Sequence, residues 1–250
     1  MAMKRIPDEI LNDASTVHPA KNLYTMFGKR TLDVLLSGTA IVILSPLLGV
    51  VAVLELKYHG KPVLYHTLRP GKDGNPFKMY KFRSMTNATD KDGNLLPDKD
   101  RLTSFGKFIR KTSIDELPEL FNIFKGDMSI IGPRPLLMEY MDFYSPRHKM
   151  RHAVRPGLAC VRVHEKPGDT WTWADQFEND IWYIENLSFK TDVQELIAIV
   201  KKVLFPDKFR SDSTRVPFLG NETLYDVRTN KEAGLDDVVF ASTNMNGAVK

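Results

Sequence analysis

The hydrophobic and polar positions of this chain divide it into one long apolar run and a mixed, mostly amphipathic remainder. Residues 34–54 read VLLSGTAIVILSPLLGVVAVL and contain no charged side chain. A helix of that length rises about 1.5 Å per residue and can cross the roughly 30 Å apolar core of a bilayer. The run does not fit a cleavable signal peptide, because it begins late, is too long and is followed by charged residues. The pattern predicts one membrane-associated helix.

Two features bear on whether this helix crosses the bilayer. Pro46 lacks a backbone donor and clashes with the preceding turn, so we expect a kink there, with the Ser45 hydroxyl available to a freed carbonyl. Lys29 and Arg30 precede the run and Lys57 follows it, so both flanks are basic and indicate no crossing direction. A kinked helix that spans, and a broken helix that enters and leaves by one face, both fit this pattern.

The remainder of the chain predicts a strand pair followed by helices. Alternating side chains predict strands over residues 62–68 and 77–85 around a turn at 70–74. Residues 86–100 are expected to form a charged loop, because their spaced acids do not fit a calcium-binding loop. Helical spacing of apolar residues predicts helices near 7–11 and over 102–109, 114–124, 136–144, 174–186 and 192–204. The last of these is amphipathic and fits either a core-facing helix or one lying at a membrane surface.

Composition and charge narrow the class of protein. With 250 residues, 42% hydrophobic, and a mean hydropathy of -0.27, the chain is not a polytopic membrane protein, and 10% aromatic residues exclude wholesale disorder. The net charge is +4, of which residues 211–250 contribute 4 - 6 = -2, so residues 1–210 carry +6. A basic body beside an apolar helix favours lipid and phosphate over nucleic acid. The single cysteine, Cys160, excludes an intrachain disulfide.

The candidate chemistry is concentrated between residues 110 and 135. Ser113 and Glu116 have the spacing of a capping box, which predicts that Asp115 and Glu116 lie in the first turn of a helix. Adjacent helical side chains point about 100° apart, so we expect one acid to meet a substrate while the other meets a metal. Acids in a first turn also complement the helix dipole, which is the purely structural alternative.

Basic side chains in short, rigid sequence contexts accompany this acidic pair: Lys81, Arg83, Arg110, Lys111 and Arg134. Arg134 stands between two prolines, which restrict its backbone. Guanidinium groups suit phosphate oxygens, and cations beside carboxylates suit phosphoryl transfer, in which a carboxylate either binds Mg²⁺ or attacks phosphorus. For each basic residue taken alone, a solvated surface position is the alternative.

The ordered motifs of the chain resemble those of one enzyme family. In chain order they are Lys29-Arg30 with Asp33, Ser45-Pro46, Lys81-Phe82-Arg83-Ser84-Met85, Ser113-Ile114-Asp115-Glu116-Leu117-Pro118, Gly126-Asp127-Met128-Ser129 and Gly132-Pro133-Arg134-Pro135. Over about residues 29–205 this series resembles the bacterial sugar transferases, the monotopic polyprenol-phosphate phosphoglycosyl transferases. No single motif is specific, whereas their ordered combination is.

The resemblance implies an activity and residue roles. Family members transfer a sugar-1-phosphate from a UDP-sugar to undecaprenyl phosphate, the first membrane step of surface glycan or glycoconjugate assembly. Carried over, Asp115 is the nucleophile that forms a phosphosugar-aspartyl intermediate and releases UMP, which predicts ping-pong kinetics. Glu116 is implied to help bind Mg²⁺. The implied phosphate-binding or structural supports are Lys81, Arg83, Arg110 and Arg134.

The resemblance also implies an architecture, which is mixed α/β and mostly helical. It consists of a polar arm over residues 1–28, a re-entrant membrane helix broken at Ser45-Pro46 over 29–60, a compact catalytic domain over 61–210 with interfacial amphipathic helices, and a tail over 211–250. The expected partners are the UDP-sugar donor, the undecaprenyl phosphate acceptor and membrane lipid, without nucleic acid. The expected location is the cytoplasmic face of the bacterial inner membrane. Whether the tail packs on the body or serves a homo-oligomer contact is left open.

Three further features of the sequence bear on the site. Asp180 and Asp192 fall where the family carries acids in its C-terminal helices, so both are candidate substrate-binding residues, with surface or capping acids as the alternative. Glu119 stands where the family commonly has Gln. The stretch LACVRVHEKPGD at residues 158–169 departs from the usual family pattern, so the resemblance does not assign the sugar.

Trp171 and Trp173 closely follow this stretch. They are expected either to stack on a base, to sit at the membrane interface or to pack in the core.

A non-catalytic membrane-associated scaffold of a glycan-assembly complex is a second class of function. The presence of both Asp115 and Glu116 argues against it.

Overall fold

The computed structural model describes residues 8–160, 173–204 and 218. Within these residues the chain is mostly helical with a few strands, as predicted. The helices are α1 (Asp8–Leu11), α2 (Lys29–Tyr58), α3 (Asp98–Arg101), α4 (Ser104–Lys111), α5 (Glu119–Lys125), α6 (Pro146–Lys149), α7 (Trp173–Glu185) and α8 (Phe189–Leu204). The strands are β1 (Leu64–Pro70), β2 (Pro76–Phe82), β3 (Ser129–Ile131) and β4 (Gly157–Ala159). Short 3₁₀ turns connect several of these elements, and a π-helical turn, Tyr24–Gly28, leads directly into α2.

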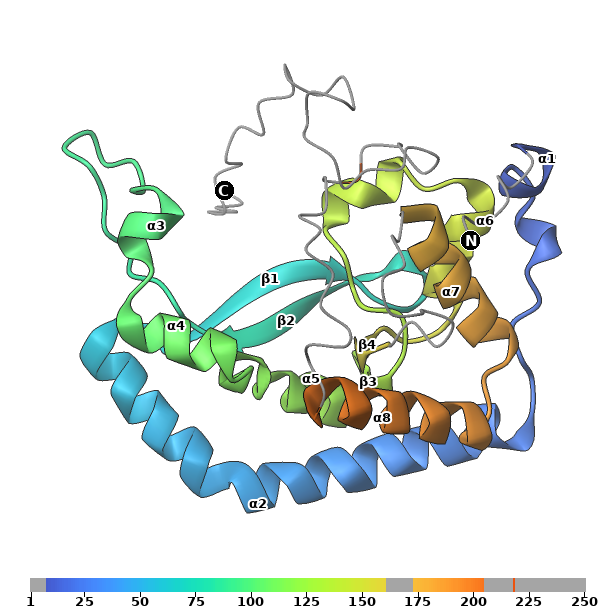
Figure 1. Ribbon diagram of the computed structural model, residues 1–250, viewed down its shortest axis with the longest axis horizontal. Coiled ribbons are helices and arrows are strands. Elements are labelled where there is room, and N and C mark those ends of the chain that lie inside the picture. The colour runs from blue at the N-terminus through green and yellow to red at the C-terminus, as the bar shows by residue number, and fades with distance from the viewer. Residues whose placement is uncertain (1–7, 161–172, 205–217, 219–250) are drawn as a thin grey trace.

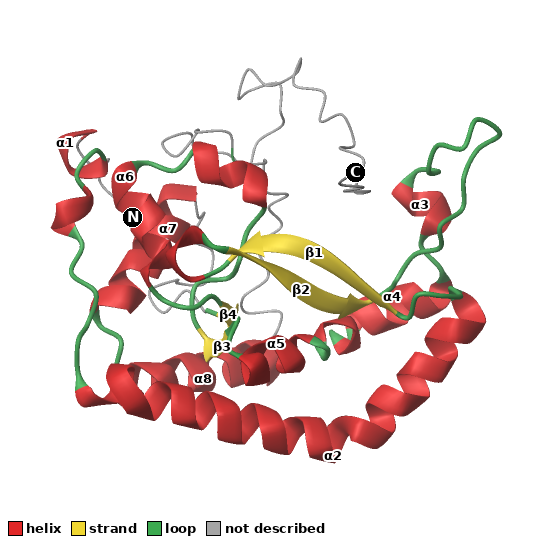
Figure 2. Ribbon diagram, turned by 180° about the vertical axis from the view of Figure 1, so that it is seen from behind, coloured by secondary structure: helices red, strands yellow, loops and turns green. Residues whose placement is uncertain are grey.

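The long helix α2 forms one edge of the molecule, and α4, α5 and α8 lie along it (Figure 1). The helical stretch Tyr24–Tyr58 is apolar enough to cross a membrane, and only 11% of its most apolar window is buried. The helix is bent in its middle part rather than interrupted (Figures 1 and 2). The Ser45 hydroxyl donates to the Val42 carbonyl at 2.8 Å, which is the carbonyl that Pro46 cannot pair. The predicted kink and its hydroxyl partner are therefore confirmed.

The N-terminal end of α2 is fixed to the body by a buried carboxylate and an arginine. Asp33 is 4% exposed and accepts hydrogen bonds from the Ser129 hydroxyl at 3.0 Å and the Ile130 amide at 2.9 Å, both in β3. Arg30 donates to the Phe124 carbonyl at 2.7 Å, where the last carbonyls of α5 lack helical partners. This end of the apolar helix is thus held to β3 and α5 by polar contacts, of which those of Asp33 are buried.

The C-terminal end of α2 is held by a second polar chain. The Glu55 carboxylate is 2.8 Å from His59 Nδ1, and His59 Nε2 is 2.8 Å from the Thr103 hydroxyl. Thr103 in turn caps α4 by accepting the Gly106 amide at 2.9 Å. Both ends of α2 are therefore tied to the same body, one to β3 and α5 and the other to α4.

The two longer strands form the predicted hairpin and carry α5. β1 and β2 pair antiparallel, with Leu64 opposite Phe82 and Pro70 opposite Pro76. Asn122 of α5 lies against β2, since its side chain accepts the Tyr80 amide at 3.1 Å and donates to the Lys78 carbonyl at 2.7 Å. This docking brings the turn that precedes α5 beside Lys81, the next residue of β2. The core between these elements comprises Phe77, Met79, Ile123 and Met128.

The remaining expectations about local structure are mostly confirmed. The helices predicted near 7–11 and over 102–109, 174–186 and 192–204 are present, whereas the segment 136–144 forms only the 3₁₀ turn Met138–Asp142. In the charged loop, the Asp90 carboxylate accepts the backbone amides of Asp92 and Asn94 at 2.9 Å each, so its acids serve the turn. Only α3 adds regular helix at the end of this loop.

Candidate active site

The two acids of the candidate site lie on a tight turn between α4 and α5. The predicted capping box is wrong, because the Ser113 side chain makes no capping bond and its backbone is left-handed, with φ 54° and ψ 20°. Such a conformation costs a non-glycine residue about 1–2 kcal/mol. It reverses the chain so that residues Ile114–Glu116 form a 3₁₀ turn, and α5 begins only at Glu119. Asp115 and Glu116 therefore lie in a turn outside the helix.

Glu116 is the centre of a small ion network. Its Oε1 atom accepts Lys81 Nζ at 2.7 Å and Arg134 Nη2 at 2.5 Å. Lys81 Nζ also lies 3.1 Å from Glu119 Oε1, so the ammonium group is placed between two carboxylates. These residues come from β2, the turn, α5 and the loop after β3, and the structure brings Lys81 and Arg134 into contact with Glu116.

The environments of the two adjacent acids shift their pKa values in opposite directions. Burial, followed by the neighbouring charge of Glu116, raises the pKa of Asp115. Burial also opposes ionisation of Glu116, but the charges of Arg134 and Lys81 outweigh it and lower the pKa of Glu116. Asp115 accepts no hydrogen bond from another side chain of the described residues. Asp115 is a half-buried carboxylate with a raised pKa, whereas Glu116 is held by two cations with a lowered pKa.

Two residues that sequence reasoning did not place in the site contribute to its electrostatics. Glu119 is 2% exposed, and burial raises its pKa against the opposing influence of Lys81. Arg69, near the end of β1, has a buried Nε atom without a hydrogen-bond partner, and burial lowers its pKa while its charge interacts with those of Glu139 and Arg134. The position of Arg69 directly before the Pro70–Gly71 turn was the only sequence signal that could have indicated it.

The backbone of Arg134 is held by a buried ion pair. Arg151 is 2% exposed and donates to Asp180 Oδ2 at 2.7 Å and to the Arg134 carbonyl at 2.9 Å. The Arg134 side chain is half exposed and extends to Glu116. The loop before it is tight, because a Cβ atom on Gly157 would lie 2.1 Å from the Gly132 amide nitrogen. Asp180 thus does not line the Asp115 turn; it is joined to the site through Arg151.

The other two predicted supports make mainly structural contacts. Arg83 is 7% exposed and donates to the carbonyls of Gly60 at 3.4 Å and Pro62 at 3.2 Å, which holds the chain that leaves α2. Arg110 Nε donates to the Ser84 hydroxyl at 2.6 Å, and its charge acts to lower the pKa of Asp115. Arg110 therefore stays a candidate phosphate-binding residue, whereas Arg83 is bound to backbone.

Asp192 belongs to a separate cluster that joins α8 to the start of α2. Its carboxylate accepts the hydroxyls of Tyr24 at 2.6 Å and Tyr183 at 2.7 Å, and Lys29 Nζ at 2.6 Å. Among the described residues no hydrogen bond or ion pair links this cluster to Asp115, so the structure does not bring Asp192 into the site.

The structure describes Trp173 but not Trp171, and of the tail it describes Phe218 alone. Trp173 packs in an aromatic cluster with Phe177 and Tyr140, so the core alternative holds for it. Trp171, residues 161–172 of the departing loop and the tail over 211–250 lie outside the described residues, apart from Phe218.

Comparisons with known proteins agree with these features. The family model described as bacterial sugar transferase matches residues 24–206. The uncharacterized sugar transferase EpsL of Bacillus subtilis is 45% identical over 185 residues, covering 72% of this chain and 88% of that protein. A UDP-glucose:undecaprenyl-phosphate glucose-1-phosphate transferase of Caulobacter vibrioides is 34% identical, covering 72% of this chain and 70% of that protein.

A third relative is longer than this chain. The UDP-N-acetylgalactosamine-undecaprenyl-phosphate N-acetylgalactosaminephosphotransferase of Aeromonas hydrophila is 39% identical over 71% of this chain. The match spans only 44% of that protein. The family match over residues 24–206 includes both α2 and the Asp115 turn.

Proposed function

This chain belongs to the bacterial sugar transferase family, and we propose that it transfers a sugar-1-phosphate from a UDP-sugar to undecaprenyl phosphate, releasing UMP and forming undecaprenyl diphosphate-linked sugar. Relatives named for this type of reaction support the proposal. The observation that carries it is the Asp115 turn, where an unpaired carboxylate lies next to an anchored carboxylate, Glu116, with Lys81 and Arg134 at 2.7 and 2.5 Å from the latter. A carboxylate without an ion-pair partner, next to cations that can bind phosphate oxygens, suits attack on a phosphoryl group.

The proposed reaction has two displacements at phosphorus. In the first, an Asp115 oxygen forms a bond to the sugar-bearing phosphorus while the bond from that phosphorus to the bridging oxygen breaks, and UMP leaves with the electron pair. In the second, an oxygen of undecaprenyl phosphate attacks the same phosphorus and releases the Asp115 carboxylate. Lys81 and Arg134 hold the phosphate oxygens and stabilise the charge that develops on them. The two half-reactions predict ping-pong kinetics.

The residues of this site fit a Mg²⁺ ion that would bind together with the diphosphate of the UDP-sugar. No group of three His, Cys, Asp or Glu residues that could hold a metal occurs among the described residues. Mg²⁺ is commonly bound through one or two carboxylates plus substrate phosphates and water. In Glu116 both cations contact Oε1, which leaves Oε2 as the oxygen that would hold the ion. Bound there, the ion would neutralise charge on the diphosphate.

The proposal is tested by a donor panel. Full-length protein in detergent is incubated with undecaprenyl phosphate, Mg²⁺ and UDP-linked glucose, galactose or N-acetylhexosamines, and UMP release is measured. We expect UMP from at least one donor, its loss with EDTA and its return with added Mg²⁺. The absence of UMP from every donor would instead favour the non-catalytic scaffold, and release that survives EDTA would refute the metal assignment.

We propose further that α2 is re-entrant, entering and leaving the membrane by the cytoplasmic face. Support comes from its two ends, since Asp33 attaches one end to β3 and His59 attaches the other to Thr103, which caps α4 of the same body. A helix held in this way cannot place its ends on opposite sides of a bilayer unless the body is divided between them. The bend near Pro46 allows the middle of the helix to lie deepest.

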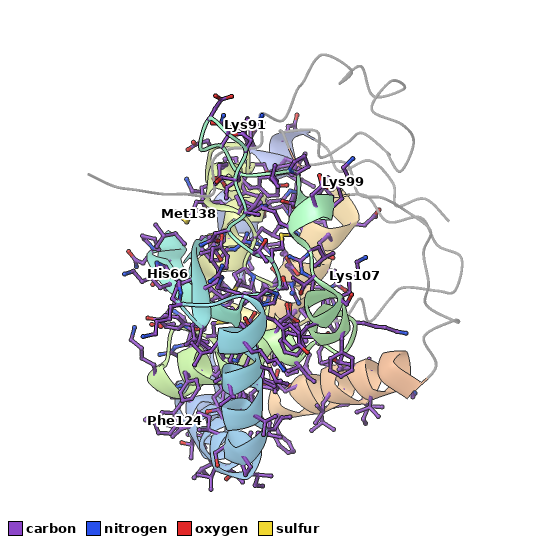
Figure 3. All side chains as sticks on the ribbon, turned by 90° about the vertical axis from the view of Figure 1, so that its left-hand side faces the viewer. His66, Lys91, Lys99, Lys107, Phe124 and Met138 are labelled. Atoms are coloured by element: carbon purple, nitrogen blue, oxygen red, sulfur yellow. The ribbon has the colours of Figure 1, made fainter. Side chains whose placement is uncertain are left out.

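Exposed apolar side chains on other elements extend this membrane-facing edge. They lie on α4, α5 and α8: Phe108, Phe121, Phe124, Phe189, Val193, Leu196, Ile197 and Val200. In the side view, Phe124 lies at the end of the molecule near α2, whereas Lys91 and Lys99 lie at the opposite end (Figure 3). The charged loop would therefore face the cytosol while α8 lies at the membrane surface.

Cysteine labelling tests this topology. In a Cys160→Ser background, Leu23→Cys and Lys61→Cys place thiols at the two ends of α2, and Lys91→Cys marks the body. We expect a membrane-impermeant maleimide to label none of the three in intact cells and all three in inverted membrane vesicles. Labelling of one end of α2 from outside and the other from inside would show that the helix spans the membrane.

A further inference from the structure

The tail residue Phe218 fills an aromatic socket on the catalytic body. Its side chain is 0% exposed. Its ring centre lies 4.9 Å from that of Phe177, edge to face, and 5.4 Å from that of Tyr144, stacked. Tyr140 at 5.6 Å, Trp173 at 5.8 Å and Phe143 at 6.3 Å also border Phe218. Ring pairs at such distances add stability beyond that of buried area alone, so the socket holds Phe218 specifically.

The socket shares two of its rings with the ion pair behind the candidate active site. The Arg151 guanidinium lies 5.7 Å from the centre of the Tyr144 ring and 5.6 Å from that of Phe177. The Tyr144 hydroxyl also accepts a hydrogen bond from Arg151 at 3.3 Å. These rings therefore confine the guanidinium that donates to the Arg134 carbonyl at 2.9 Å. Loss of Phe218 would remove packing from both rings at once.

We propose that Phe218 is a positioning residue for the transfer reaction, acting through Tyr144, Phe177 and Arg151 on the backbone of Arg134. The region matched by the family model ends at residue 206, so this anchor is supplied by a segment of the chain beyond the shared domain. The inference rests on the proposed function, because Arg134 holds phosphate oxygens only in the proposed transfer reaction. The occupant of the socket is this chain's own C-terminal segment.

The test compares Phe218→Ala with the conservative Phe218→Leu in the full-length chain. Removing a buried ring leaves a cavity, so we expect Phe218→Ala to lower Tm by about 10 °C. Well below both melting midpoints, we expect its kcat for UMP release to fall by about tenfold to a hundredfold, with a smaller change in KM, because Arg134 is displaced from its working position. Phe218→Leu should recover most of both losses. Leu68→Ala, which truncates an exposed apolar side chain of β1, serves as the stability control.

Each outcome decides one part of the proposal. A Phe218→Ala protein that melts like the unchanged chain would show that the socket does not anchor the tail. Early melting with full turnover at low temperature would show that Phe218 supplies stability alone, which overturns the positioning role. If the unchanged chain released no UMP, the proposed function would fail separately, while Tm and a red shift of tryptophan emission, expected because Trp173 borders the socket, would still report on anchoring.

Discussion

Replacing Asp115 with asparagine is expected to abolish the transfer reaction, lowering the rate of UMP release by at least about 10⁴-fold, or roughly 5 kcal/mol of transition-state stabilisation. Asparagine keeps the shape of the side chain but cannot form the phosphoryl bond at physiological pH. The fold should persist, because Asp115 accepts no hydrogen bond from another side chain of the described residues. Asp98→Asn is the matched control, since that carboxylate is 72% exposed and its ion pair among the described residues is with Arg101, three positions away.

The measurement is direct trapping of the intermediate. A donor labelled in the sugar is mixed with protein in the absence of undecaprenyl phosphate, the reaction is quenched, and label on the protein is counted together with UMP released. The unchanged chain and Asp98→Asn should both carry label, and Asp115→Asn should carry none. Label on the Asp115→Asn protein would show that another group is the nucleophile.

The pH dependence of the same reaction follows from the shifted pKa of Asp115. Burial and the charge of Glu116 raise this pKa, and only the carboxylate attacks. The rate should therefore be full above the raised pKa and be lost as the pH falls through it, so the acidic limb of kcat/KM lies above the range of an ordinary aspartate. Glu116→Gln removes the neighbouring negative charge and should move this limb to lower pH, although the rate itself falls. If the acidic limb of the Glu116→Gln profile stayed at the same pH, it would not report the ionisation of Asp115.

Replacing Asp180 with alanine is expected to destabilise the fold strongly. This change leaves the guanidinium of Arg151 buried without its counter-ion, because both side chains are at most 1% exposed in the pair. Breaking one side of a buried ion pair costs about 3–5 kcal/mol. The free energy of unfolding should fall by that amount, and Tm by about 10 °C. The loss should also reduce transfer activity, since Arg151 holds the Arg134 carbonyl.

A double variant distinguishes the ion pair from general damage. Asp180→Leu combined with Arg151→Met replaces both charges by apolar side chains, so it should melt well above Asp180→Ala. Its activity should stay low, because no donor then reaches the Arg134 carbonyl. Asp98→Ala, at an exposed carboxylate, should leave Tm unchanged. If Asp180→Ala melted like the unchanged chain, the pair would not be a determinant of stability.

Local patterns predicted most of the secondary structure because their signals lie within a few residues. The apolar run, Pro46 and Ser45 predicted a kinked helix in which the serine hydroxyl pairs the carbonyl that proline leaves free. The hydrogen bond from Ser45 to the Val42 carbonyl confirms it. Alternation predicted the hairpin. The capping box failed because Ser113 adopts a left-handed conformation that the turn between two packed helices requires, and no helical spacing encodes that.

The sequence by itself determined the family resemblance, the apolar helix, the acidic pair and its expected basic partners, since motif order and residue chemistry are properties of the chain. Only the tertiary structure decided what those residues do for one another. In the folded chain Lys81 and Arg134 form ion pairs with Glu116, and Asp192 forms one with Lys29 away from the site. Asp180 contacts the site through Arg151, which donates to the Arg134 carbonyl. The physical reason is that these contacts join residues far apart in the chain. Their geometry is fixed by the docking of α5 on β2 and of the body on both ends of α2, which no local pattern specifies.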